Sequence, residues 1–167
     1  MRFYSLYKGY MSNIRYGSGV KLFCKLDCGA LCTLVNLYAL SKLLDIDKEE
    51  LRKKVRTIGY SCIFYGYNGA GTECYVCRIR GLNIDGDLFN DLFIVVDLTE
   101  LRDEQGKLVP KILIGQNLLV CCDGSIGFGA IGGYMFFNVA DISQHYIFTY
   151  KVLTNLSSMP FLDEIVK

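Results

Sequence analysis

LDCGALCTLV, residues 26–35, places one aspartate between two runs of strand-forming residues. Upstream, residues 20–26 alternate apolar and basic side chains, which predicts a strand. Leu26 should bury the end of that strand, so the carboxylate of Asp27 would emerge from a partly desolvated place. Gly29 permits a close backbone approach because it has no side chain. An Asp-x-Gly sequence alone also fits an ordinary turn. Whether Asp27 is a functional carboxylate or a plain turn residue therefore depends on the sequence around it.

A second stretch, ILIGQNLL at residues 112–119, predicts a buried strand that meets a glycine and then a short helix. Between the two stretches lies the glycine-rich sequence GYNGAG, residues 66–71, flanked by strand-like residues 61–65 and 72–79. This pattern predicts a long hairpin with a mobile tip. The continuous apolar run at residues 92–98 predicts a buried strand.

Two short helices are expected between the first strands and the hairpin. Leu37, Leu40, Leu43 and Leu44 recur at helical spacing. Residues 47–50, DKEE, form a capping-box pattern with aspartate as the cap, and this predicts a second short helix with a solvated, charged face.

The two stretches, in this order and around a glycine-rich hairpin, resemble the two signatures of the retropepsin-like (retroviral-type) aspartic proteases. The first signature is an apolar residue, Asp, Thr or Ser, Gly and Ala, then two variable residues, Thr and an apolar pair. The second is two apolar residues, Gly, a variable residue, Asn or Asp, and two apolar residues. The resemblance covers about residues 18–130. It implies one mainly β domain over residues 1–167: a closed β-barrel acid-protease half with a flap hairpin, short helices and a C-terminal extension at about 131–167.

The resemblance also implies roles for individual residues. Asp27 would be the catalytic residue, within an active-site loop of Cys28, Gly29 and Ala30. The flap would contain Gly66, Tyr67, Asn68, Gly69, Ala70 and Gly71. Thr33, Gly115 and Asn117 would be structural, with Gly115 and its apolar neighbours packed beneath the active-site loop.

One aspartate cannot serve as acid and base in one step, but two neighbouring carboxylates that share a proton can. The chain has one such motif, so the simplest source of the second aspartate is a homodimer. The expected activity is hydrolysis of peptide or protein substrates, with no cofactor and no metal.

Three positions depart from the family pattern. Cys28 stands where the family has Thr or Ser, and a thiol is a weaker hydrogen-bond donor than a hydroxyl. Leu31 and Gln116 are neutral where retroviral members often carry an acid and an arginine. These departures leave open a second hypothesis, in which the chain is a catalytically weak or inactive dimerisation or peptide-binding module.

Eight cysteines raise a third hypothesis, a metal-binding or redox protein. The single CxxC, Cys74 to Cys77, lies in a strand-like run, where alternation would point its two thiols to opposite faces. The chain has one histidine, His145, and its spacing from the cysteines does not support a Cys–His hydrolase.

The composition excludes other classes of function. Half of the chain is apolar (51%), which is enough to bury a core, and the net charge is +1 with both signs mixed along the sequence. No basic block favours nucleic acid, and no long uncharged apolar run or secretory leader favours a membrane. We therefore expect a soluble, cytoplasmic protein.

Overall fold

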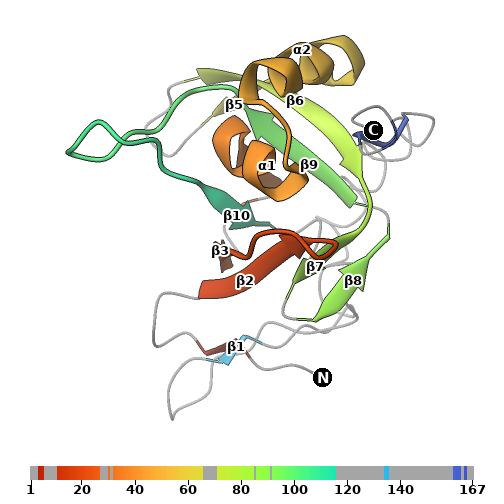
Figure 1. Ribbon diagram of the computed structural model, residues 1–167, viewed down its shortest axis with the longest axis vertical. Helices are drawn as coiled ribbons and strands as arrows, with labels where there is room; N and C mark the ends of the chain where they lie inside the picture. The colour runs from red at the N-terminus through yellow and green to blue at the C-terminus, as the bar shows by residue number, and fades with distance from the viewer. Residues whose placement is uncertain are drawn as a thin grey trace.

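A computed structural model describes residues 4–5, 11–26, 30, 32–65, 71–84, 86–90, 92–115, 134–135, 160–162 and 164. The helices in this part of the chain are α1 (Leu37–Leu44) and α2 (Lys48–Ile58). The strands are β1 (Tyr4–Ser5), β2 (Met11–Tyr16), β3 (Leu22–Leu26), β4 (Thr33–Asn36), β5 (Tyr60–Tyr65), β6 (Gly71–Ile79), β7 (Leu82–Ile84), β8 (Asp87–Phe89), β9 (Leu92–Asp97), β10 (Ile112–Ile114) and β11 (Tyr134–Met135) (Figure 1).

Nine of these strands form one sheet in the order β5-β6-β9-β4-β10-β3-β2-β7-β8. Consecutive strands make three antiparallel hairpins, β2–β3, β5–β6 and β7–β8. Two contacts are parallel, β10 with β3 and β4 with β9. Strands β1 and β11 form a separate antiparallel pair. The fold is therefore mixed α/β, with a mostly antiparallel open sheet and two helices.

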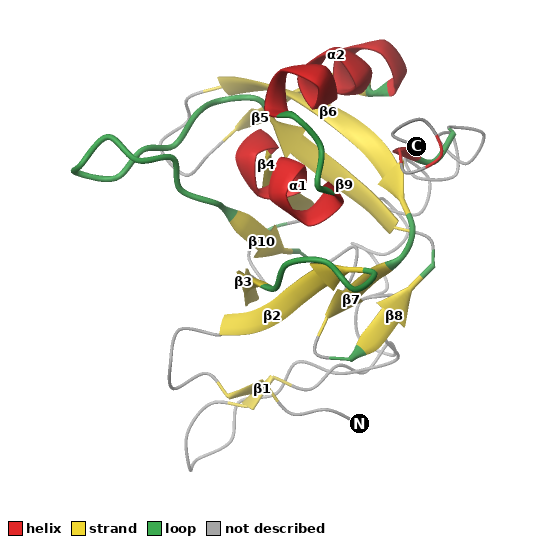
Figure 2. Cartoon of the chain, viewed as in Figure 1, coloured by secondary structure: helices red, strands yellow, loops and turns green. Residues whose placement is uncertain are grey.

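The expectation of a closed β-barrel is wrong for the part of the chain that the structure describes. The order of the sheet begins with β5 and ends with β8, and these two edge strands do not pair with each other. A barrel closes only when its edge strands meet. Here the buried face of the sheet is covered instead by helices, which gives a layered α/β arrangement (Figure 2).

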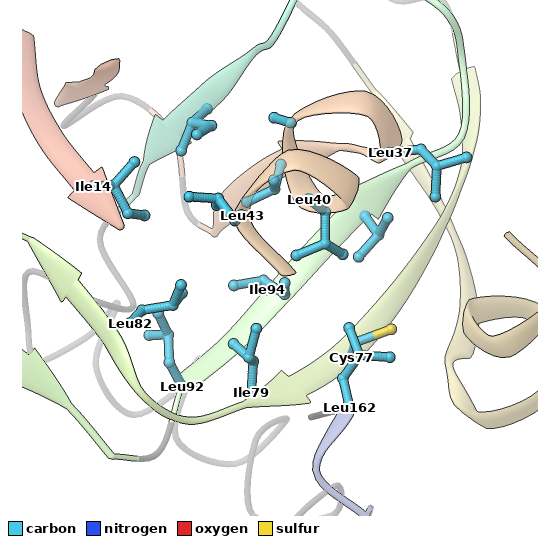
Figure 3. Close-up of a cluster of buried hydrophobic side chains, with 14 of the residues drawn as sticks. Ile14, Leu37, Leu40, Leu43, Cys77, Ile79, Leu82, Leu92, Ile94 and Leu162 are labelled. Carbon is cyan, nitrogen blue, oxygen red and sulfur yellow. The ribbon is translucent and has the colours of Figure 1, made fainter. Parts of the chain in front are cut away.

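Both helices begin where the sequence predicts and pack on one face of the sheet. Asn36 caps α1 by accepting a hydrogen bond from the Ala39 N–H, and Asp47 caps α2 through the N–H groups of the next turn. Leu40 and Leu43 of α1 point toward β9 in the core (Figure 3). No helix among the described residues is long and apolar enough to cross a membrane.

The two cysteines of the CxxC sequence lie on opposite faces of β6, as strand alternation predicts. Cys77 is buried in the main core beneath the helices. Cys74 is buried in a smaller apolar cluster with Leu34 and Val95. The pair is therefore divided between two cores and does not form one thiol site.

A short segment near the C-terminus packs against β6. Phe161 forms a parallel bridge with Arg78, and its ring lies 4.2 Å from the guanidinium carbon of Arg78. Leu162 is fully buried in the main core, next to Cys77 in the close-up (Figure 3). Residues far apart in the sequence thus complete one core.

Candidate active site

The segment that joins β3 to β4 carries the expected catalytic residue. Four of its residues lie outside the described part of the chain: Asp27, Cys28, Gly29 and Leu31. The segment leaves the sheet at Leu26 and re-enters it at Thr33, and Ala30 and Cys32 are partly buried between these ends. The geometry of the site is therefore given by the strands that hold both ends of this segment.

Strand β10 lies between the two strands that the segment connects. It pairs in parallel with β3, where Ile114 is opposite Leu26. It pairs antiparallel with β4, where Ile112 is opposite Val35. Because of these directions, the end of β3 and the start of β4 flank the carboxyl end of β10. The two signature stretches are consequently neighbours in space.

Gly115 lies in close contact with the backbone of Cys32, in the segment that joins β3 to β4. A Cβ atom built on Gly115 would lie 2.3 Å from the carbonyl oxygen and 2.4 Å from the carbonyl carbon of Cys32. Real Cβ atoms do not approach backbone this closely, so any side chain here would push the end of the segment away. Gly115 permits β10 to pack directly against the segment that carries Asp27.

A buried hydrogen bond fixes the same contact. The Gly115 N–H donates to Oγ1 of Thr33 at 3.2 Å, and Thr33 is only 1% exposed. Two residues for which the family resemblance implies structural roles are therefore brought together. Asn117, for which it implies the same role, lies outside the described residues.

The glycine-rich stretch joins the two strands of a hairpin. Strands β5 and β6 pair from Tyr60 opposite Val76 to Tyr65 opposite Gly71. Residues 66–70, five of the six expected flap residues, lie outside the described part, and Gly71 is the first residue of β6. Strand β5 is an edge of the sheet, and its Tyr60 and Ile63 are more than 60% exposed. The hairpin is present, and its role as a flap stays a prediction.

Asn36 is a positioning residue that the sequence patterns did not single out. Its side chain donates to the carbonyl of Val109 at 2.9 Å and accepts from the N–H of Lys111 at 3.0 Å, while also capping α1. Asn36 is 2% exposed. It therefore ties the loop before β10 to the end of β4. An asparagine directly before an apolar helical repeat is the signal that could have identified the cap, but not the contact with the loop.

Three of the described cysteines, Cys32, Cys62 and Cys77, are free thiols with a raised pKa. Burial raises the pKa of Cys77 to about 12, and burial with the nearby Cys62 raises the pKa of Cys32. Burial also raises the pKa of Cys62. The thiolate is both the nucleophile and the metal ligand, so a raised pKa disfavours both uses near neutral pH. Within the described ranges, no three or more His, Cys, Asp or Glu residues form a group that could hold a metal ion.

In comparisons with known proteins, the chain matches no protein-family model and no curated protein. A functional assignment therefore depends on the contacts around β10 and on the sequence patterns.

Proposed function

We propose that the chain is an aspartic endopeptidase of the retropepsin type, which acts as a homodimer and pairs Asp27 of one subunit with Asp27 of the other. In this proposal the sheet is a retropepsin-like acid-protease half, and residues from about 131 to 167 are an extension of it. The substrate is an extended peptide or protein segment, and the reaction needs no cofactor.

One observation carries the proposal: β10 lies between β3 and β4, with Gly115 against the backbone of Cys32. The resemblance to the family predicts that the second signature packs beneath the loop of the first. Nothing in composition or periodicity requires residues 26–35 to meet residues 112–115. Their contact is therefore support that is independent of the sequence patterns.

The chemistry would follow from the proximity of two carboxylates. Like charges this close resist double ionisation, so the pair holds one proton and titrates as a unit. The ionised carboxyl removes a proton from water, and the water oxygen attacks the peptide carbonyl carbon. The protonated carboxyl donates its proton to the carbonyl oxygen as the tetrahedral intermediate forms. The carboxyl that took the proton from water then donates it to the leaving amine, while the other carboxyl takes back a proton from a hydroxyl of the intermediate as the C–N bond breaks.

The β5–β6 hairpin would supply the binding of an extended substrate. A hairpin that closes over a peptide excludes water and can add main-chain hydrogen bonds to it. The paired residues from Tyr60 to Tyr65 and from Gly71 to Val76 give the hairpin a stiff base. Residues 66–70 connect these two strands in the sequence, and in this proposal they supply the contacts of the flap.

The alternative is a dimerisation or peptide-binding module with little or no activity. Cys28 favours it, because the family's hydroxyl at this position ties two active-site loops together and a thiol is a weaker donor. Replacement of Cys28 with Thr separates the alternatives: activity that rises in this variant indicates a working site weakened by the thiol.

The decisive experiment is cleavage of a diverse peptide library by the wild-type chain and by Asp27→Asn, over an acid-to-neutral pH range. We expect the substitution to lower cleavage by at least about a hundredfold, because it removes acid–base catalysis. Asp45→Asn is the matched control: Asp45 is exposed and has a φ of 51°, a conformation that asparagine also adopts. This control should retain full activity.

Light scattering on each variant completes the test. Loss of cleavage by an Asp27→Asn chain that is still dimeric supports the proposal. A folded wild-type dimer that cleaves nothing supports the binding module, and a monomeric wild type contradicts a site shared between subunits.

A further inference from the structure

The face of the sheet that points away from the helices carries a polar cavity at β2 and β7. Its volume is about 470 Å³ and its lining includes Asn13, Arg15, Gly17, Lys21, Asn83 and Gly86. Ile14 points into the main core, so its neighbours Asn13 and Arg15 project to the opposite face. Arg15 lies opposite Asn83 in the β2–β7 pair, and Lys21 lies next to Leu22, which is opposite Ile14.

The charged side chains among the described residues that line this cavity are all positive. Arg15 and Lys21 bring two positive charges, and no acidic residue is among the described residues that line it. Neither cation forms an ion pair with another described residue, although five such pairs occur elsewhere on the surface. Arg15 is half-buried, so its charge is less screened than that of a fully exposed side chain.

Asn83 adds donors to the same cavity. Its Oδ1 accepts the Gly86 N–H at 2.8 Å across the turn between β7 and β8. The Nδ2 group of the same side chain carries two N–H donors. The guanidinium of Arg15, the ammonium of Lys21 and the amide N–H₂ of Asn83 therefore belong to residues that line the same cavity, and all three groups are hydrogen-bond donors.

We propose that this cavity binds a small, doubly charged oxyanion, which is a phosphate monoester or a dicarboxylate. The planar guanidinium of Arg15 can pair with two oxygens at once, and Lys21 supplies a second point charge. Two cations without an acidic partner among the described residues match a dianion better than a monoanion. The site is distinct from the segment that carries the proposed catalytic residue, because Lys21 precedes β3 whereas that segment begins after Leu26 at its other end, about 16 Å away along an extended strand.

The test is a titration of the full ¹⁵N-labelled chain at low ionic strength, first with inorganic phosphate and then with succinate. We expect saturable NMR shifts of the Arg15 Nε–H, the Asn83 side-chain amide and the Gly86 N–H. Arg15→Gln and Lys21→Gln should each weaken binding at least about threefold, and together at least about tenfold, because each removes a charge-assisted contact. Saturation by phosphate alone or by succinate alone identifies which oxyanion the cavity takes.

The matched control is Lys53→Gln with Lys107→Gln, which removes two exposed positive charges away from the cavity. It should leave the dissociation constant within about twofold. The proposal is overturned if neither anion gives saturable shifts, if the shifts map elsewhere, or if the control weakens binding as much as the cavity variants do. Circular dichroism checks the folding of each variant. If a variant does not fold, the test depends on which residues of the wild-type chain show NMR shift changes in the titration.

Discussion

The Gly115 N–H donates to the Thr33 hydroxyl across 82 positions of sequence, in a buried contact of 3.2 Å. The bond joins the end of β10 to the start of β4. Because Cys32 precedes Thr33, the same contact holds the segment that carries Asp27 against β10. A structural contact and the proposed chemistry are thus coupled through one stretch of backbone.

Replacement of Gly115 with Ala tests this coupling. The new Cβ would overlap the backbone of Cys32, which cannot rotate away as a side chain can. We expect a loss of about 1–3 kcal/mol in the free energy of unfolding, typical of overpacking. Any peptidase activity should fall further than this loss explains, because the Asp27 segment is displaced.

The control for this variant is Gly106→Ala. Gly106 has a φ of 76°, and a Cβ atom added there would meet no other atom within 4 Å, so alanine bears only the cost of its backbone conformation. It should cost about 1 kcal/mol or slightly more and leave activity unchanged. Urea denaturation and the cleavage assay measure both effects. An unperturbed Gly115→Ala protein would contradict the close packing.

Local elements could be predicted from the sequence, because their signals are local. The leucine repeat and the Asp47 cap predict α1 and α2, and the glycine-rich stretch predicts the β5–β6 hairpin. The alternation that separates Cys74 from Cys77 is likewise a property of one strand. In each case the residues that determine the structure lie within a few positions of one another.

The order of the strands could not be predicted in this way. Strand β10 has three residues, and its place between β3 and β4 depends on contacts over about eighty positions. The closed barrel was inferred from the family resemblance, whereas the described edge strands β5 and β8 stay apart. The resemblance did indicate that Gly115 belongs near the Asp27 segment, which periodicity alone could not do.

Asn36 should contribute more stability than an ordinary helix cap. Asn36→Ala removes the cap of α1 and both side-chain hydrogen bonds to the loop at Val109 and Lys111. Since these groups are largely buried, we expect a loss of about 2–4 kcal/mol in the free energy of unfolding. Asp47→Ala, at the exposed cap of α2, should cost only about 1 kcal/mol. Equal losses in urea denaturation would contradict the role of Asn36 in holding the loop.

Leu162 should anchor the C-terminal segment to the core. Its side chain is fully buried, so Leu162→Ala leaves a cavity and should lower the free energy of unfolding by about 2–5 kcal/mol. Leu101→Ala, at a position 44% exposed, should cost less than about 1 kcal/mol. The Arg80–Glu164 ion pair beside the anchor is exposed, and Glu164→Gln should change stability by less than about 1 kcal/mol. A small effect of Leu162→Ala in thermal unfolding would show that the segment does not complete the core.

Cys77 should make stability fall at alkaline pH. Burial raises its pKa in the folded protein from an ordinary value of 9.0 to about 12. Below pH 9 the thiol is protonated in both states, so it causes no pH dependence there. Between pH 9 and 12 the unfolded chain loses the proton while the folded chain keeps it, which favours unfolding by about 1.4 kcal/mol per pH unit.

Comparison with Cys77→Ala isolates this effect from the other groups that titrate in the same range. By about pH 10.5, the stability of the wild type relative to the variant should be about 2 kcal/mol lower than at pH 8. Urea denaturation under reducing conditions at both pH values measures the difference. Cys62→Ala is the control, and because Cys62 is only partly buried, its relative stability should change less. Parallel pH profiles of the wild type and Cys77→Ala would mean that this thiol reaches solvent in the folded protein.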